Sequence, residues 1–450
     1  MASARGEFSS RFGFVMAAAG SAVGLGNIWG FPTQAASNGG AAFLLVYLFL
    51  AFTLAYPALM AELIIGRHAH ANAVSALRLI SPNPLLRHVG AATGIIGFIV
   101  ASLILSFYAI VAGWMIAFCI SSLSDLLGMT QVSSWLTSFG LPRNILFMLI
   151  FMALTVGIIA EGVREGIERW SERLMPVLLI TLVLLVLYVL TLDGAMDGLK
   201  VYLLPDVERA LSPQLIISAL GAAFFSLSLG VGTMLIYGSY INDDENLPVV
   251  GSLVTLVDIS IAVTAGFLVL PAMYVALHNG VEIFTATGEL ISEDTLIFTV
   301  LPELFKAMGT TGIVISFTFF FLMSIAALTS SISMLEVPVA YTIEEHGVGR
   351  KKAVFVIGGL IALVSAIILM NFSELFGLVV AFTTRYSQPL LGFMFCVYAG
   401  WIWHRDQLLQ EVRKGSPEVE QTLFWSIWPW YVRFVCPVII LAIFAQSIVG

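Results

Sequence analysis

Long apolar stretches alternate with short polar segments along the whole 450-residue chain. An α-helix crosses the hydrocarbon of a bilayer in about 20 apolar residues, so each long stretch predicts one membrane-spanning helix. The connection Asn279–Gly309 is long and contains a helix-like stretch, Thr295–Met308. The pattern predicts an all-α polytopic membrane protein with eleven transmembrane helices, at residues 13–36, 41–66, 90–123, 144–160, 174–192, 214–240, 249–278, 311–343, 353–370, 375–403 and 425–449.

Glycine interrupts two of these stretches in a comparable way, at Gly20–Asn27 (GSAVGLGN) and at Phe225–Gly232 (FSLSLGVG). The interruptions are five helices apart. Because five is odd, the chain predicts two inverted five-helix repeats, residues 13–192 and 214–403, and a final helix at 425–449. Glycine-broken spans at matching positions of two halves are typical of a transporter's binding site. The simpler alternative is that these glycines only allow close helix packing.

Composition narrows the class of protein further. The chain is 59% hydrophobic and only 11% charged, whereas soluble domains carry about 25% charged residues. A net charge of −8 with 20 Lys and Arg also excludes a nucleic-acid partner. The partner that this composition requires is the lipid bilayer. The three cysteines lie in apolar stretches without metal-site or disulfide spacing, which predicts buried small hydrophobic residues: Cys119, Cys396 and Cys436.

The distribution of Lys and Arg predicts the orientation in the membrane. With the N-terminus inside, the inner segments hold 14 of these residues and the outer segments hold 4. Since positive residues gather on the cytoplasmic side, an odd number of spans puts the N-terminus inside and the C-terminus outside. The predicted location is the cell membrane.

A helix break in mid-membrane exposes backbone groups that must line a polar cavity. The half-helix that starts near Leu25 would attract a carboxylate, and free carbonyls before it would suit Na⁺ or an ammonium group. Hydroxyl and amide oxygens complete a site for a hard cation, although Ser and Thr also bond their own helix carbonyls. An ionisable residue inside a span indicates function by default, with a structurally paired acid as the alternative. The candidate side chains are Asn27, Ser226, Asp258, Thr329 and Ser330.

Three motifs together resemble the neurotransmitter:sodium symporter family over nearly the whole chain. They are GSAVGLGNIWGFP at Gly20–Pro32, FFSLSLG at Phe224–Gly230 and LTSS at Leu328–Ser331. The resemblance implies a single transporter domain over residues 1–450. It implies a sodium-coupled amino-acid symporter that works by alternating access, with two Na⁺ ions and a small-molecule substrate at the helix breaks.

The resemblance also implies which residues bind. The first Na⁺ site would use Ala22, Asn27, Ser226 and Asp258, and the second would use Gly20, Val23, Ala326, Thr329 and Ser330. The substrate carboxylate would meet the amides of Leu25 and Gly26. An inner gate would pair Arg5 with Glu344 near Tyr240. The full set implied for substrate binding is Ala22, Leu25, Gly26, Ile104, Tyr108, Phe225, Ser226, Ser228, Val231, Ser330 and Met334.

Several positions depart from the family pattern. The outer-gate arginine is replaced by Gly30, and the region around Ala381 holds no acidic partner. Ala222 replaces a common glutamine. An asparagine usual in the seventh span is Asp258, and a serine that helps to hold chloride in chloride-dependent relatives is Ala262. Because Asp258 supplies fixed negative charge at the first Na⁺ site, we expect no chloride dependence.

The residues at the break favour a neutral α-amino acid as substrate. Gly24 has no side-chain carboxylate that could pair with an amine substrate lacking a carboxylate of its own. The pocket is apolar apart from hydroxyls, so a second charge on the substrate would be costly. Arg385, about 10 residues into the tenth span, gives an alternative: it could bind a polar or acidic substrate tail, or act at the outer gate, or only bond helix carbonyls.

Two other classes of function fit less well. A cation channel would need a continuous polar path, whereas the polar residues concentrate in one belt. An enzyme is not expected, since the chain has no HExxH, GxSxG or phosphate-loop motif. The six histidines lie near loops or span ends, which is typical of surface groups rather than metal ligands. The sequence leaves the oligomeric state open.

Overall fold

The computed structural model of the protein describes residues 6–204, 210, 212–284, 290 and 296–449. Within these ranges the chain is helical, and the only β-pairing is an isolated bridge between Phe284 and Leu290. Eight helices in these ranges are long and apolar enough to cross a membrane, or nine when one bent pair counts as a span. The all-helical membrane fold is therefore confirmed, and the number eleven stays a prediction.

Most spans begin or end outside the apolar runs that predicted them. The fifth begins at Val163 rather than 174, because its first turns carry Arg164 and Glu165 on an exposed face while Ile167 is buried. Charged side chains there hide the helix from a search for apolar runs. The continuous spans are α3, η2 and α4 (Ala41–Ala69), α6 (Pro84–Leu126), α8 (Leu141–Ala160), η3 and α9 (Val163–Val189), α14 (Leu247–His278), α17 (Gly309–His346) and α18 (Arg350–Met370).

Two further regions in the C-terminal part are helices with π-helical turns inside them. The first comprises α19 (Phe372–Val380), η5 (Ala381–Ser387), α20 (Gln388–Val397) and η6 (Tyr398–Ile402). The second comprises α22 (Leu423–Trp430), η8 (Tyr431–Val435) and α23 (Cys436–Val449). They correspond to the predicted spans 375–403 and 425–449. A π-turn widens the helix locally and is frequent at functional sites.

Both predicted helix breaks are present. Helix α1 (Arg11–Ala22) ends at Ala22, and η1 (Gly26–Gly30) and α2 (Phe31–Ser37) continue at an angle of 59° to it. Helix α12 (Pro213–Ser226) and helix α13 (Thr233–Gly238) are separated by six residues. In this segment Ser228, Gly230 and Gly232 have φ of 52°, 78° and 81°, a left-handed conformation that a helix cannot continue through.

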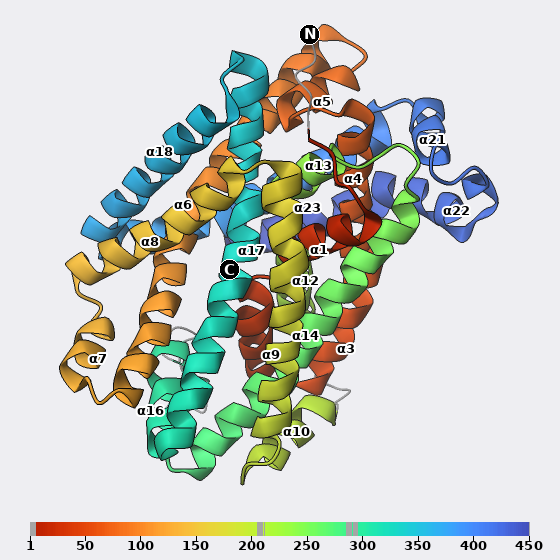
Figure 1. Cartoon of the computed structure of the whole chain (residues 1–450). Coiled ribbons are helices and arrows are strands. Elements are labelled where there is room, and N and C mark those ends of the chain that lie inside the picture. Colours follow the sequence, from red (N-terminus) through yellow and green to blue (C-terminus); the bar gives the residue numbers. More distant parts are fainter. Residues whose placement is uncertain (1–5, 205–209, 211, 285–289, 291–295, 450) are drawn as a thin grey trace.

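Short helices in the connections were not predicted by the apolar pattern. They are α5 (Ala73–Leu79), α7 (Thr130–Leu136), α10 (Ala195–Leu203) and α21 (Arg405–Arg413). The predicted stretch Thr295–Met308 is confirmed as η4 (Leu296–Val300) and α16 (Leu301–Ala307); residue 295 lies outside the described ranges. Figure 1 shows α5, α13 and α21 toward one end of the molecule and α7, α10 and α16 toward the opposite end.

Helices α4 and α13 pack with their backbones in direct contact. A Cβ atom added to Gly66 of α4 would lie 2.0 Å from the carbonyl oxygen of Leu235 in α13, so only glycine allows this approach. The expected burial of the cysteines is confirmed, since all three are buried and free. The contact at Gly66 therefore holds α13, the second half of the sixth span, tightly against the second span.

Candidate functional site

The two helix breaks meet at one cavity. Residues of α1, η1, α6, α12, α17 and α20 and of both helix breaks line it, and its free space is about 30 Å³. Ten of the eleven residues implied for substrate binding form its walls; Ser226 is the exception. The lining residues are Ala22, Gly24, Leu25, Gly26, Asn27, Ile104, Tyr108, Phe225, Ser228, Val231, Ser330, Met334 and Gln388.

Polar side chains gather beside the cavity at the predicted first ion site. Ser226 Oγ donates to Asp258 Oδ2 at 2.7 Å, and Asn27 Nδ2 donates to Asp258 Oδ1 at 2.6 Å and to Ser226 Oγ at 2.8 Å. Tyr47, from the second span, also donates to Ser226 Oγ at 3.1 Å. Three helices thus bring the predicted side chains of this site together.

Asp258 is the feature that makes this cluster suitable for a cation. It is only 1% exposed, and no Lys or Arg side chain forms an ion pair with it in the described part of the chain. A buried carboxylate without positive charge nearby is costly, and a monovalent cation would remove that cost. Asn27 Oδ1 accepts from the amide of Gly24 at 3.2 Å, and an amide oxygen has a second lone pair that can bind an ion.

The predicted second ion site lies where α1 crosses α17. Ser330 Oγ donates to the carbonyl of Val23 at 3.0 Å and to that of Gly20 at 3.3 Å. Thr329 Oγ1 donates to the carbonyl of Ala326 at 3.0 Å. The Ser330 bonds therefore join α17 to the end of α1, whereas the bond between Thr329 and Ala326 lies within α17. Two hydroxyl and three carbonyl oxygens are the ligand type that hard cations prefer.

The carboxylate end of the predicted substrate site is also assembled. The amide of Leu25 donates to the Tyr108 hydroxyl at 3.2 Å, which places the start of the half-helix against the third span. A Cβ atom on Gly24 would lie 2.6 Å from Ser330 Oγ and 2.8 Å from the Tyr108 hydroxyl. The amide-rich helix start and the hydroxyl can together bind a carboxylate, since backbone N–H groups and the helix dipole favour an anion there.

Three lining residues were not among those implied for substrate binding: Gly24, Asn27 and Gln388. Gln388 begins α20 in the tenth span, which the family pattern did not connect with the pocket. Its sequence signal is a long polar side chain, flanked by Pro389, within an apolar span. That signal marks a polar position but does not give its partner.

The inner gate residues are only partly within the described chain. Arg5 lies outside it, so the pairing with Glu344 stays a prediction. Glu344 accepts from the backbone and side chain of Asn72 at 2.8 and 2.9 Å. Tyr240 donates at 2.6 Å to Glu336, a fully buried residue that sequence reasoning missed.

Glu336 is also bonded by Arg350, at the start of α18. The guanidinium donates to both carboxylate oxygens, at 3.0 and 2.6 Å, and its Nε donates to the carbonyl of Ile159 at 2.8 Å. Two parallel hydrogen bonds make this pair directional as well as charged. The pair connects the eighth and ninth spans to the end of the fourth, and Tyr240 adds the end of the sixth.

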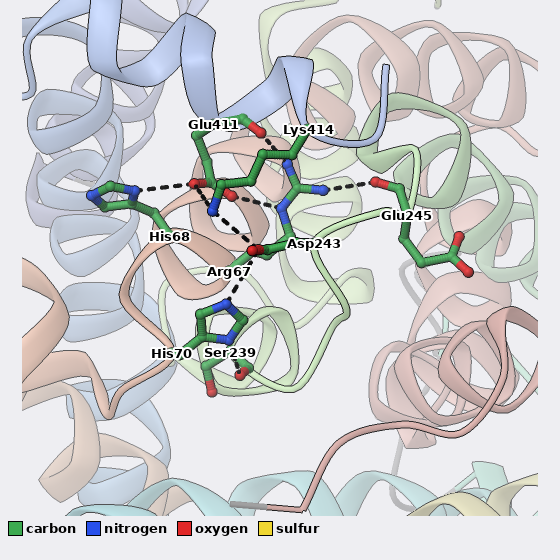
Figure 2. Close-up of polar contacts among 8 residues, drawn as sticks. All are labelled: Arg67, His68, His70, Ser239, Asp243, Glu245, Glu411 and Lys414. Atoms are coloured by element: carbon green, nitrogen blue, oxygen red, sulfur yellow. Dashed lines mark hydrogen bonds and ion pairs between the residues drawn. The ribbon is translucent and has the colours of Figure 1, made fainter. Parts of the chain in front are cut away.

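A second buried ion pair joins α4 to α21 (Figure 2). Arg67 Nε lies 2.7 Å from Glu411 Oε1, and both side chains are at most 1% exposed. Arg67 also donates to the carbonyls of Glu411 and Glu245, the latter at 2.7 Å. Lys414 lies 3.0 Å from Glu411 and 3.1 Å from Asp243. The cluster therefore fastens α21 to the second span and to the loop between α13 and α14.

Two histidines complete this cluster. His68 Nδ1 lies 3.1 Å from Glu411, and His70 Nε2 lies 3.3 Å from Asp243. Burial raises the pKa of Glu411, but the hydrogen bond with His68 and the charges of Arg67 and Lys414 outweigh it and lower this pKa to about 2. Burial likewise raises the pKa of Asp243, and Lys414 and His70 lower it by more. Both carboxylates are therefore ionised at neutral pH.

The contacts around Gly30 are aromatic rather than ionic. Trp29 meets Phe298 edge to face at 6.0 Å between ring centroids, and Trp114 meets Phe298 at 5.4 Å. A cavity of about 510 Å³ lies among these rings and α19. Arg385 sits in η5 with an exposed side chain and does not line the central cavity. Its role at a gate or with a substrate tail stays a prediction.

Comparison with known proteins agrees with this architecture. A sequence profile of the Sodium:neurotransmitter symporter family matches residues 5–140 and 127–450. The chain belongs to this family. As a sodium:neurotransmitter symporter it is a multi-pass membrane transporter, so the family resemblance seen in its motifs is confirmed.

Individual relatives of this sodium:neurotransmitter symporter cover nearly its whole length. It is 35% identical to the sodium-dependent transporter YhdH of Bacillus subtilis, over 98% of this chain and 97% of that protein. It is 31% identical to a sodium-dependent transporter of Haemophilus influenzae, over 99% and 98% of the two chains. The crystal structure of MhsT in complex with L-phenylalanine has a TM-score of 0.84 and 32% identity, over 98% of this chain and 100% of MhsT.

Proposed function

We propose that the protein is a sodium-coupled symporter that imports a neutral α-amino acid by alternating access, without a requirement for chloride. The observation that carries this proposal is the composition of the central cavity. Both helix breaks open onto it, and none of its lining residues within the described chain carries a charge. A zwitterion brings its own carboxylate and ammonium to the backbone groups of the breaks, whereas an additional charge would stay unpaired.

The similarity to MhsT supports the same substrate class, since that structure contains L-phenylalanine. Arg385 is absent from the cavity wall, which favours a neutral side chain over an acidic one. In our proposal Na⁺ binds at the Asp258 and Thr329 sites and supplies positive charge there. The residues of the two ion sites in turn hold α1, α12, α14 and α17 around the substrate.

Chloride independence follows from the charge of Asp258. A fixed carboxylate beside the first ion site supplies the negative charge that chloride would otherwise provide, and Ala262 offers no hydroxyl to hold an anion. Alternating access would move the two inverted repeats, residues 13–192 and 214–403, in a related way around the central site. The N-terminus would lie inside and the C-terminus outside.

The test is a thermal-shift screen of the purified protein with the twenty amino acids, in Na⁺ and in K⁺. Ligand binding to the folded state raises the unfolding midpoint, so at least one neutral amino acid should do so in Na⁺ only. Thr329→Val combined with Ser330→Ala is the matched control, which should lose the Na⁺ effect. Uptake into proteoliposomes then separates a symporter from a channel, because a channel would pass Na⁺ without stoichiometric amino acid. Equal shifts in K⁺ would contradict the proposal.

A further inference from the structure

Gln388 differs from the other polar residues of the central cavity in having a buried atom without a partner. Its side chain is 2% exposed and begins α20. Nε2 donates to the carbonyl of Leu229, in the break of the sixth span, at 2.8 Å. Only a nitrogen can donate to that carbonyl, so the bond fixes the amide with Oε1 as the remaining atom. Oε1 is buried and has no hydrogen-bond partner within the described chain.

The other side chains with polar atoms in the cavity wall are all bonded. The Tyr108 hydroxyl accepts from Leu25, Ser228 Oγ donates to the carbonyl of Ser21 at 3.0 Å, and Ser330 Oγ donates to Val23. Both ends of the Asn27 amide are bonded as well. Among the side chains that line this cavity in the described chain, Gln388 Oε1 is therefore the buried acceptor that has no hydrogen bond at all.

A buried acceptor without a donor is rare, because it has lost its hydrogen bond to water without replacement. A ligand that brings an N–H or O–H group to this atom restores the bond, whereas an apolar ligand of the same shape leaves it unmade. Sites built in this way reject analogues that lack the donor more strongly than apolar pockets reject a missing methylene. The neighbouring walls are apolar, from Ile104, Val231 and Met334.

We propose that Gln388 determines the side-chain specificity of the transporter. Its Oε1 accepts a hydrogen bond from an N–H or O–H group on the substrate side chain, so the preferred substrates are neutral amino acids with a donor in an otherwise apolar side chain. This inference rests on the proposed function, because it assumes that an amino acid occupies the cavity. It adds a residue of the tenth span to a pocket formed by the first, third, sixth and eighth.

The test compares matched pairs of amino acids that differ by one donor. The pairs are tryptophan and 3-benzothienylalanine, tyrosine and phenylalanine, and threonine and valine. Binding to the full-length protein in Na⁺ is measured by competition. In at least one pair the donor-bearing member should bind about tenfold more tightly, which is the scale of one hydrogen bond with a buried acceptor. Gln388→Met should reduce that ratio to about one.

Two further variants make the result specific. Gln388→Glu keeps an acceptor and should keep the preference, and Gln407→Met, at an exposed position of α21, should change nothing. An equal loss for both members in Gln388→Met would show that the residue only supports Leu229, and would overturn the inference. Amino-acid binding in Na⁺ without a preference in any pair would also overturn it while leaving the proposed function intact. No Na⁺-dependent binding of any amino acid would refute both.

Discussion

At the scale of single residues, two positions in and beside the central cavity tolerate no larger or differently charged side chain. Gly24 faces the hydroxyls of Tyr108 and Ser330 at distances that exclude a methyl group. Asp258 is a buried acid whose hydrogen bonds come from neutral groups, Asn27 and Ser226. One position is therefore defined by space and the other by charge.

Replacing Gly24 with Ala should weaken amino-acid binding at least tenfold, because the added Cβ must displace Ser330 or Tyr108 and both belong to the predicted site. Overpacking of this kind costs about 1–3 kcal/mol. Competition binding in saturating Na⁺ measures the effect. Gly221→Ala, in α12, is the control, since a Cβ atom there meets nothing within 4 Å. Normal affinity in Gly24→Ala would show that the substrate binds elsewhere.

Replacing Asp258 with Asn should either create chloride stimulation of uptake or abolish uptake, because the fixed negative charge of the first ion site is lost. Uptake into proteoliposomes is measured with chloride or gluconate as the external anion. Ser260→Asn places the same side chain two residues further along α14, at an exposed position, and should behave as the parent protein. Unchanged, chloride-indifferent uptake in Asp258→Asn would refute the role given to this acid.

At the scale of elements, two ion pairs with buried carboxylates fasten helix ends to one another. Arg67 and Glu411 are separated by 344 positions, yet their pair fastens α21 to α4. Arg350 and Glu336 fasten α18 to α17. A buried pair contributes little net stability, but removal of one partner leaves the other charge buried. These helix contacts should therefore be sensitive to single substitutions.

Arg67→Met should lower the free energy of unfolding by roughly 3 kcal/mol, since Glu411 stays buried without its main partner. The double variant Arg67→Met with Glu411→Met should lose less. Thermal unfolding in detergent measures both. Arg413→Met, on α21 like Glu411, is the control. The ion pair of Arg413 with Glu420 is exposed, and exposed pairs contribute about 0–1 kcal/mol. Equal destabilisation by the two single variants would contradict this account.

The low pKa of Glu411 predicts how stability depends on pH. Its pKa is about 2 in the folded protein against an ordinary 4.5, so the ionised carboxylate stabilises the fold above pH 4.5. This contribution should disappear as the pH falls from 4.5 toward 2, because the folded state must then take up a proton. Unfolding midpoints of the parent and Glu411→Gln should converge over this range. A constant difference between them would exclude the assignment.

At the scale of the whole molecule, the orientation predicted from Lys and Arg can be tested with cysteine labelling. The three native cysteines are buried, so the background reaction is low. Gln131→Cys, on α7, should react with a membrane-impermeant maleimide in intact cells. Glu418→Cys, after α21, should react only after permeabilisation. Both residues are exposed, so the opposite pattern would reverse the assignment of inside and outside.

The all-helical membrane fold, the two helix breaks and most of the cavity were predictable from the sequence. Apolar runs and glycine breaks are local signals, and the family motifs led to ten of the lining residues. The partners of Arg67 and Arg350 were not predictable, because such pairs depend on which helix ends meet in space. Gln388 was missed for the same reason. Short helices such as α21 were not predicted, because they are too short and too polar to produce an apolar run.

The close contact between α4 and α13 has a consequence for mutational tolerance. Since a Cβ atom at position 66 would lie 2.0 Å from the Leu235 carbonyl oxygen, a saturation library at this position should retain glycine alone after selection for function. At Gly97 and Gly157, where a Cβ atom meets nothing within 4 Å, alanine and serine should survive. Natural variation at position 66 would thus be confined by the backbone of another helix, independently of any ligand.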